Sequence, residues 1–298
     1  ECIEGNAKLV SPHELEVNGS LLSTKNIVIA TGASPAIPPI PGLEDSAYST
    51  SDSIWKLREL PKKLLIIGGG PIGCELAQAF RRLGSEVTIL TRDPKVLPKE
   101  DRDLAELVLK NFESEGIQMQ TEVKVDRIEK KNSEQQIYFQ KDGVEQHIKA
   151  DHILLATGRK PGTSGLGLKE VGVELNPDGT VKVDPFLRSS IPNIYACGDV
   201  AGPFQFTHLA GHQAWYATVN ALFSPFKKFA VDYRVVPWCT FTDPELARVG
   251  LSEEDALQQN IAYEKTTFDL SGLDRAIAER NNYGIIKVLT KPGKDQIL

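Results

Sequence analysis

The chain has 298 residues, and its 34 basic and 40 acidic residues give a formal net charge of −6 at pH 7. This length allows two or three domains. Because acidic residues slightly outnumber basic ones and no run of basic residues occurs, we do not expect nucleic acid as a partner. The most apolar stretch, residues 64–80, is interrupted by glycines, a proline and Glu75. We therefore expect no membrane segment.

The four cysteines are widely separated and form no C-x-x-C or metal-ligand spacing. This pattern is typical of reduced, intracellular proteins, so we expect a cytoplasmic location and no metal site. No secretory signal is found at the start. Because the first residues run directly into an apolar segment ending at Gly32, we expect the chain to begin within a domain.

The first expected strand covers residues 26–29. It is followed by a proline-rich connector, residues 35–42, which can continue neither a helix nor a central strand. A second domain should begin soon afterwards.

A βαβ unit is expected next. It consists of a strand at 64–67, a helix at 72–83 ended by Gly84, and a strand at 86–90. Another helix should begin near Asp101 and end before Gly116. Short strands then lead to a strand at 152–155, so a doubly wound sheet with an inserted β-meander is predicted.

After Gly158 the expected elements are a turn at 176–179, strands at 181–183 and 194–197, and a helix at 207–222. Pro225 and residues 226–233 are interpreted as another connector. Strands at 238–241 and 283–289 complete the prediction.

A nucleotide-binding turn is the first chemical motif. Residues 68–73, Gly-Gly-Gly-Pro-Ile-Gly, match G-x-G-x-x-G between a strand and a helix. Gly68 permits the tight turn, Gly70 lets the backbone approach a pyrophosphate, and Gly73 allows close packing. The phosphate would meet free N–H groups at the helix start. The alternative is an ordinary strand-to-helix turn.

Two cations follow the second strand of this unit, where an NAD site usually has a carboxylate. Arg92 and Lys95 would instead pair with a 2′-phosphate, which favours NADPH, although NADH is possible. The alternative is that both are solvated surface charges.

Three further segments carry a resemblance to a known family. They are Ile29-Ala30-Thr31-Gly32-Ala33-Ser34-Pro35, Leu155-Ala156-Thr157-Gly158-Arg159-Lys160-Pro161 and Ile194-Tyr195-Ala196-Cys197-Gly198-Asp199. Together, in this order around the glycine motif, they resemble the class I pyridine nucleotide-disulfide oxidoreductases, which include mercuric reductase and dihydrolipoamide dehydrogenase. The stretch through Ile40-Pro41-Gly42 looks most like mercuric reductase.

The resemblance implies an α/β, two-dinucleotide-binding flavoprotein fold. A Rossmann-like NAD(P) domain, residues 45–158, would interrupt a partial FAD domain made of residues 1–44 and 159–233. Residues 234–298 would begin an α+β dimerisation domain, since the segment from Phe241 to Gly250 resembles the start of that domain. The alternative for Asp243-Pro244 is a simple turn.

The resemblance also implies binding residues. Asp199 would accept hydrogen bonds from the ribityl chain of FAD, and Arg159 would lie near the pyrophosphate of FAD. An isolated Gly-Asp is otherwise more often a turn. The remaining implied residues are Gly158 for NADPH and Thr31, Gly32, Gly198, Phe206 and Thr207 for FAD.

Phe206-Thr207 would start a helix whose dipole stabilises negative charge on the reduced flavin. His208 and His212 follow at i, i+4 spacing, but no nearby Cys or carboxylate completes a metal site. Two histidines on one helix face is the simpler interpretation. The resemblance leads us to expect proline in place of His208 in several relatives.

Glu75 resembles the family's glutamate beside the nicotinamide, and an acid in the first turn of the helix would equally favour the helix dipole. Cys74 beside it is interpreted as a packing residue. The family's redox cysteine pair and His-Glu dyad have no counterpart here, so we expect this chain alone to be incompetent in substrate reduction.

The implied activity is transfer of hydride from NADPH to flavin and then to a disulfide or a metal-thiolate such as Hg(II), in a homodimeric parent. The alternatives are a nucleotide-binding and dimerising module without turnover, and a ferredoxin-reductase-like enzyme. The segment from Phe241 argues against the latter.

Overall fold

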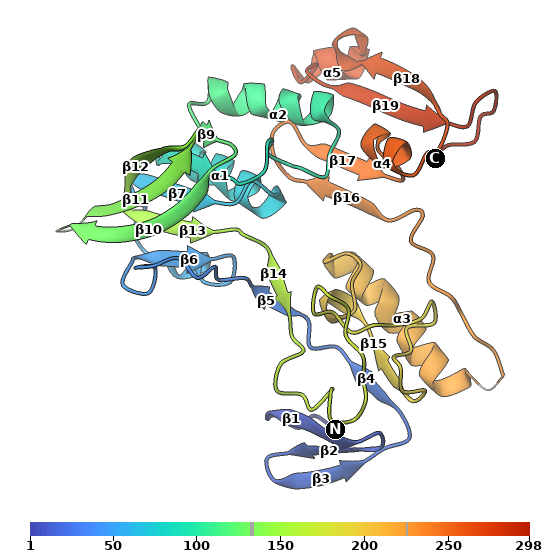
Figure 1. The fold of residues 1–298 in the computed structure, drawn as a ribbon. Helices are drawn as coiled ribbons and strands as arrows, with labels where there is room; N and C mark the ends of the chain where they lie inside the picture. The colour runs from blue at the N-terminus through green and yellow to red at the C-terminus, as the bar shows by residue number, and fades with distance from the viewer. Residues whose placement is uncertain (132–133, 225) are drawn as a thin grey trace. The chain divides into compact units, whose positions relative to one another are not determined.

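The computed structural model describes residues 1–131, 134–224 and 226–298 (Figure 1). Pro225, part of the expected connector, lies outside the described residues. These residues form two compact units: Glu1–Ser34 with Arg159–Val236, and Pro35–Gly158 with Pro237–Leu298. The chain passes between the units three times: within β5 (Ala33–Pro35), at the start of β14 (Arg159–Pro161), and between Val236 and Pro237.

The first unit opens with an antiparallel sheet of three strands, β1 (Ala7–Ser11), β2 (Glu14–Val17) and β3 (Ser20–Ser23). The sequence analysis did not anticipate this sheet. Its second turn is made by Asn18 and Gly19, whose φ angles are 51° and 77°. An Asn-Gly pair accepts this left-handed backbone and is the typical turn of a two-residue hairpin.

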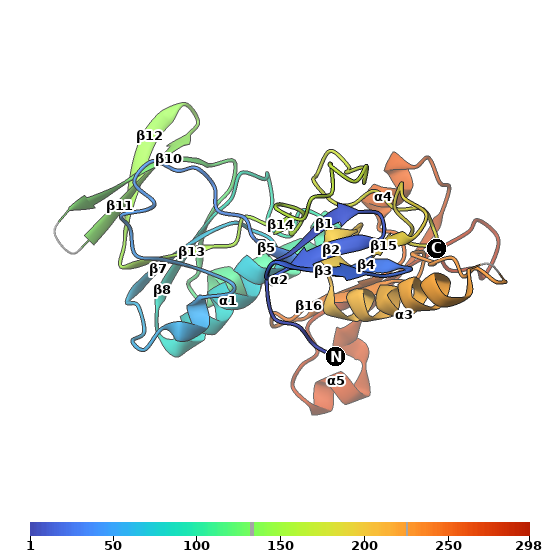
Figure 2. The ribbon, with the colours of Figure 1, turned by 90° about the horizontal axis from the view of Figure 1, so that it is seen from below.

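The expected strands at 26–29 and 194–197 are confirmed as β4 (Ile27–Ile29) and β15 (Ile194–Ala196), which pair in parallel. The expected helix is confirmed as α3 (Thr207–Phe223), and it lies against these two strands (Figures 1 and 2). A 3₁₀ turn, η2 (Gly198–Val200), follows β15.

The strand expected at 181–183 does not form. Val181 makes only an isolated bridge with Leu175. The N–H of Val181 donates to Val200, whereas that of Lys182 donates to Glu174. Leu175 and Val181 flank a turn closed by the Asn176 N–H to Thr180 hydrogen bond, and the pairing does not extend beyond this one bridge.

In the core of the first unit, successive side chains along β15 and the residue after it pack on opposite sides of the strand. Ile194 and Ala196 pack with Leu9 and Ile29 on one side, while Tyr195 and Cys197 pack with Ala217 of α3 on the other. Successive side chains of a strand point to opposite faces, so this short strand is buried from both sides.

The second unit contains a parallel sheet in the order β6-β13-β7-β8-β9. Its strands are β6 (Tyr48–Thr50), β7 (Lys63–Ile67), β8 (Glu86–Leu90), β9 (Gln118–Gln120) and β13 (His152–Leu155). A 3₁₀ turn, η1 (Ile54–Lys56), and the helices α1 (Pro71–Leu83) and α2 (Arg102–Ser114) accompany it. The predicted βαβ unit is thereby confirmed. Gly84 ends α1 with a φ of 113°, where glycine avoids strain.

Both faces of this sheet are covered. Leu64 and Ile66 of β7 pack in the cluster that includes α1 and α2, whereas Leu65 and Ile67 pack beneath the predicted meander. The meander is antiparallel and consists of β10 (Lys124–Lys131), β11 (Glu134–Lys141) and β12 (Val144–Ala150). Burial on both faces explains the unbroken apolar run of β7.

The C-terminal part of the second unit adds two antiparallel pairs, β16 (Pro237–Thr240) with β17 (Leu246–Val249) and β18 (Glu264–Asp269) with β19 (Ile285–Thr290). It also holds α4 (Glu253–Gln258), η3 (Leu270–Gly272) and α5 (Asp274–Ala278). Among the helices of the described ranges, none combines the length and the apolar character needed to cross a bilayer.

Candidate nucleotide and flavin sites

The glycine turn between β7 and α1 has the geometry that its sequence predicts. Gly68 has a φ of 123°, and a Cβ added there would lie 2.2 Å from the carbonyl oxygen of Ala156. A Cβ on Gly73 would lie 2.2 Å from the carbonyl oxygen of Gly68. Around Gly70, in contrast, no heavy atom of the described chain lies within 4 Å of the added Cβ. Gly68 and Gly73 are therefore required by packing, and Gly70 faces open space.

This open space adjoins the start of α1. Gly70 is the N-cap residue, with φ −79° and ψ −179°, Pro71 is the first helical residue, and no side chain of the described residues caps the first N–H groups. The positive end of the helix dipole points toward the same place. Backbone donors, positive potential and room for a ligand are what a pyrophosphate requires.

The two expected cations differ in their surroundings. Arg92 is exposed, directly follows the buried Thr91, and makes no hydrogen bond or ion pair with the part of the chain that the structure describes. The Lys95 ammonium lies 2.5 Å from Glu254 Oε1 and 2.6 Å from the carbonyl oxygen of Glu100, and its side chain is only 19% exposed. Arg92 is thus available to a ligand, whereas Lys95 holds α4 in place.

Glu75 is the fifth residue of α1, so the expectation that it places an acid in the first helical turn is wrong. Its Oε1 accepts a hydrogen bond of 2.8 Å from the N–H of Phe241. This contact supports a structural role, because it fixes the segment after β16 against α1. Gly158, at the end of the unit's first segment, has a φ of 109°, and its carbonyl accepts from Ala36 N–H at 2.9 Å.

Cys74 is fully buried, as a packing residue would be. Burial, with a smaller contribution from the charge of Glu75, raises the pKa of this thiol to about 12. A thiol with such a pKa is scarcely ionised at neutral pH and is a poor nucleophile.

The residues expected to hold FAD all lie in the first unit. The Thr31 hydroxyl donates to the carbonyl of Gly162 at 2.7 Å, and Gly32, with a φ of 65°, accepts from Gly162 N–H at 2.9 Å. Arg159 Nε lies 3.4 Å from Asp199 Oδ2, and its guanidinium also donates to Ala33. Residues 31–33 are thus hydrogen-bonded to residues 159–162, and Arg159 lies beside Asp199.

Asp199 lies in η2 directly after Gly198, which has a φ of 77°. Phe206 is the N-cap residue of α3 and Thr207 its first residue, and no described side chain caps this helix start. The 20% exposed carboxylate of Asp199 and the uncapped helix start can therefore offer an acceptor and donors to one ligand.

His208 and His212 are engaged with aromatic rings. The His208 ring stacks on Phe206 at a centroid distance of 5.4 Å, and the His212 ring meets Tyr216 edge-on at 4.8 Å. These contacts support the interpretation of two histidines on one helix face.

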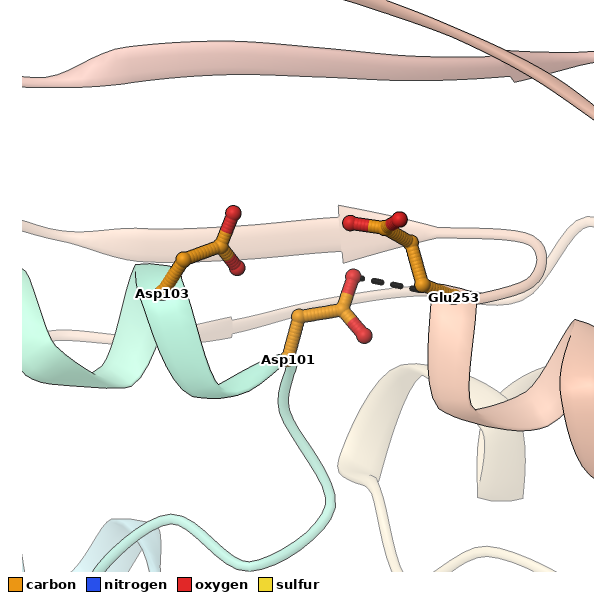
Figure 3. Close-up of side chains that lie close together, drawn as sticks. All are labelled: Asp101, Asp103 and Glu253. Atoms are coloured by element: carbon orange, nitrogen blue, oxygen red, sulfur yellow. Dashed lines mark hydrogen bonds between the residues drawn. The ribbon is translucent and has the colours of Figure 1, made fainter.

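An acidic cluster in the second unit was not predicted. Asp101, Asp103 and Glu253 have ligand atoms close enough to hold a metal ion (Figure 3). The Lys287 ammonium already lies among them, 3.1 Å from Asp101, 2.6 Å from Asp103 and 2.7 Å from Glu253. The lysine side chain is only 4% exposed, so it supplies the positive charge that these carboxylates need.

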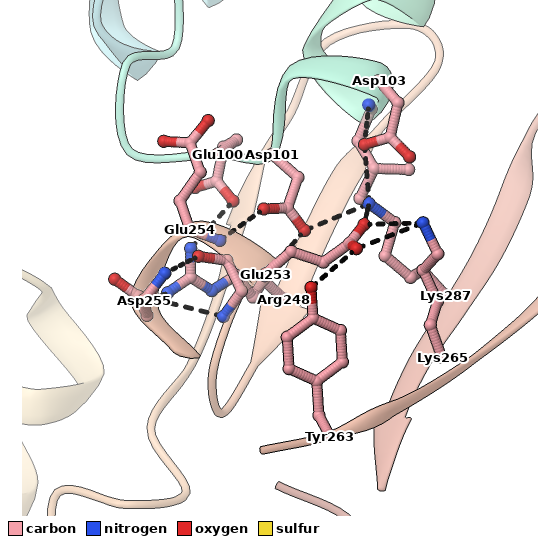
Figure 4. A network of polar contacts seen from close by, with 12 residues as sticks. Glu100, Asp101, Asp103, Arg248, Glu253, Glu254, Asp255, Tyr263, Lys265 and Lys287 are labelled. Atoms are coloured by element: carbon pink, nitrogen blue, oxygen red, sulfur yellow. Dashed lines mark hydrogen bonds and ion pairs between the residues drawn. The ribbon is translucent and has the colours of Figure 1, made fainter. Parts of the chain in front are cut away.

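This cluster belongs to a larger polar network that joins α2 to α4 and β19 (Figure 4). Burial raises the pKa of Glu253, but hydrogen bonds from Lys287, Lys265 and Tyr263 outweigh it, and the pKa lies below its usual range. Residues far apart in sequence meet here, so no local pattern could reveal the network.

Comparisons with known proteins match two parts of the chain. A family described as pyridine nucleotide-disulphide oxidoreductase matches residues 1–214, and the dimerisation domain of pyridine nucleotide-disulphide oxidoreductases matches residues 236–298.

Similar proteins include a mercuric reductase of Lysinibacillus sphaericus, 38% identical over 97% of this chain and 53% of that protein. A dihydrolipoyl dehydrogenase of Thermus scotoductus is 35% identical over 100% of this chain and 64% of that protein. Among solved structures, a HOCl-induced flavoprotein disulfide reductase of Escherichia coli superposes with a TM-score of 0.88 at 32% identity, covering 99% of this chain and 67% of that one. The chain thus spans about half the length of the mercuric reductase that it matches.

Proposed function

Because the chain belongs to the pyridine nucleotide-disulphide oxidoreductase family, we propose that it forms the core of an enzyme that uses FAD to oxidise NADPH and to reduce a disulfide or a Hg(II)-thiolate. Two features of the structure support this proposal, and each offers the groups that a dinucleotide needs. One is the open glycine turn at Gly70, and the other is the Asp199 turn beside Arg159.

The residues of the first unit fit FAD. Asp199 would accept from the hydroxyls of the ribityl chain, and Arg159, 3.4 Å from that carboxylate, would meet the pyrophosphate. Thr31, Gly32 and Gly198 would shape the backbone around the cofactor. The uncapped start of α3, at Phe206 and Thr207, would place donors and the helix dipole toward negative charge. When bound, FAD supplies hydride acceptance and onward electron transfer.

The residues of the second unit fit NADPH. Gly68, Gly70 and Gly73 would hold the pyrophosphate at the start of α1, and Gly158 would border the site. Arg92 would pair with the 2′-phosphate, while Lys95 has its partner in Glu254. Glu75 is proposed to lie beside the nicotinamide and to keep its backbone contact with Phe241.

We further propose that the chain acts as a homodimer, since residues 236–298 match a dimerisation domain. Residues 1–44 and 159–233 would belong to the flavin domain, 45–158 to the nicotinamide domain and 234–298 to the dimer interface. The four cysteines form no disulfide, which supports a reducing, cytoplasmic setting.

The test is reconstitution with FAD followed by removal of the unbound cofactor and measurement of flavin absorbance. The proposal expects a yellow protein, and it expects Asp199→Asn to bind FAD more weakly. Asp184→Asn is the control, because Asp184 also pairs with an arginine, Arg188, at 2.8 Å. A colourless protein that still binds NADPH would contradict the proposal and favour a nucleotide-binding, dimerising module.

A further inference from the structure

A buried amide lies behind the proposed flavin site. Gln213 is 0% exposed, two turns into α3. Its Oε1 accepts a hydrogen bond of 2.6 Å from the N–H of Gly198. Its Nε2 donates to the carbonyl of Gly202 at 2.7 Å and to the hydroxyl of Tyr233 at 2.9 Å.

These bonds fix both ends of the turn that carries Asp199. Gly198 begins the 3₁₀ turn and precedes the aspartate, and Gly202 follows the C-cap residue Ala201, with its N–H donating to the Gly198 carbonyl at 3.2 Å. One end presents a donor and the other an acceptor, so a single side chain can satisfy both only if it carries an acceptor and a donor together. An amide meets this requirement, whereas an ionised carboxylate, an ammonium and an alkyl group do not.

The same side chain ties the turn to the helix. The backbone of Gly198 approaches α3 closely, since a Cβ added there would lie 3.3 Å from the Cβ of Ala210. Gln213 adds hydrogen bonds to this close contact. Gln213 thus links the turn that carries Asp199 to α3 by hydrogen bonds as well as by packing.

We propose that Gln213 is a positioning residue for the flavin: it holds the carboxylate of Asp199 and the uncapped N–H groups of α3 in the relative arrangement that one FAD molecule requires. This inference rests on the proposed function, and it assigns a role to a residue that would not touch the cofactor.

The physical consequence of losing this amide is specific. A methionine of similar size would fill the space but leave Gly198 N–H and Gly202 C=O buried without their partner. The backbone of the turn would become more mobile in the flavin-free protein. Because FAD would then have to order the turn on binding, its affinity should fall about tenfold.

The experiment compares Gln213→Met with Asn220→Leu in the full 298-residue chain. Asn220 is a matched control because it is also 0% exposed on α3. Its amide bonds to Phe186 and to the backbone of Phe229, not to the Asp199 turn. Urea unfolding, FAD affinity by quenching of flavin fluorescence, and hydrogen exchange of residues 197–202 would be measured for both.

Both variants should lose stability, but only Gln213→Met should weaken FAD binding about tenfold and accelerate exchange at residues 197–202. Equal effects of the two variants on FAD affinity and on exchange would overturn the inference. If the unaltered chain binds no FAD, the proposed function fails by itself. Exchange in the flavin-free protein then decides separately whether Gln213 holds the turn.

Discussion

The substitution Gly70→Ala should weaken nucleotide binding while leaving the folding stability nearly unchanged. The φ of −79° is accessible to alanine, and no described heavy atom lies within 4 Å of the added Cβ. Reduced freedom of the unfolded chain should stabilise Gly70→Ala by about 0.4–1 kcal/mol. Replacing the N-cap glycine should cost a similar amount, about 1 kcal/mol. The melting temperature should therefore shift by no more than about 2–4 °C.

The methyl group would, however, fill the space where the pyrophosphate meets the backbone. Loss of charge-assisted hydrogen bonds of about 1.5–3 kcal/mol should weaken NADPH binding by roughly 10- to 100-fold. Isothermal titration with NADPH, together with thermal unfolding, measures both quantities on one preparation.

Gly73→Ala provides the contrast, because its Cβ would lie 2.2 Å from the carbonyl oxygen of Gly68. Forcing this backbone apart should destabilise the protein by about 1–3 kcal/mol even without nucleotide. The reasoning is refuted if Gly70→Ala binds NADPH as tightly as the unaltered chain, or if Gly73→Ala is equally stable.

Three further substitutions or treatments test other parts of the account. Arg92→Glu should lower the ratio of NADPH to NADH affinity at least about tenfold, since the pair with the 2′-phosphate becomes a repulsion; an unchanged ratio refutes the NADPH preference. Lys287→Met should destabilise the protein by about 3 kcal/mol in urea unfolding, because Asp101, Asp103 and Glu253 lose the buried cation that they share. Since the pKa of Glu253 is lowered on folding, its contribution is present above the ordinary glutamate pKa of about 4.3 and is lost as pH falls through the folded value. The loss of stability at acid pH should therefore be smaller in Lys287→Met, which lacks one of the cations that lower the pKa of Glu253. Iodoacetamide at neutral pH should label the exposed Cys2 and spare Cys74, as read by mass spectrometry; rapid labelling of Cys74 in folded protein contradicts its raised pKa.

Local signals in the sequence predicted much of the fold. The apolar run of β7, the glycine turn and Gly84 lie within thirty residues, so their consequences are local and α1 ends where the sequence indicates. The strand expected near Val181 did not form, because Val181 pairs with Leu175 in a single bridge across a tight turn. The hairpin at Asn18-Gly19 carried a recognisable signal that the sequence analysis did not use.

The site was less predictable wherever distant segments meet. The partner of Lys95 is Glu254, and that of Glu75 is the backbone of Phe241. Neither contact follows from spacing or periodicity, because each depends on how the C-terminal elements pack on α1 and α2. Gln213 carried no motif, although its helix was expected, because the amide's role depends on tertiary contacts.

The proposed function requires hydride to pass from bound NADPH to bound FAD. Its most direct test is anaerobic addition of NADPH to the FAD-loaded protein while the visible flavin band is recorded. The account predicts that the band bleaches, and that Gly70→Ala requires a higher NADPH concentration for the same effect. A band that persists at saturating, demonstrably bound NADPH would contradict it.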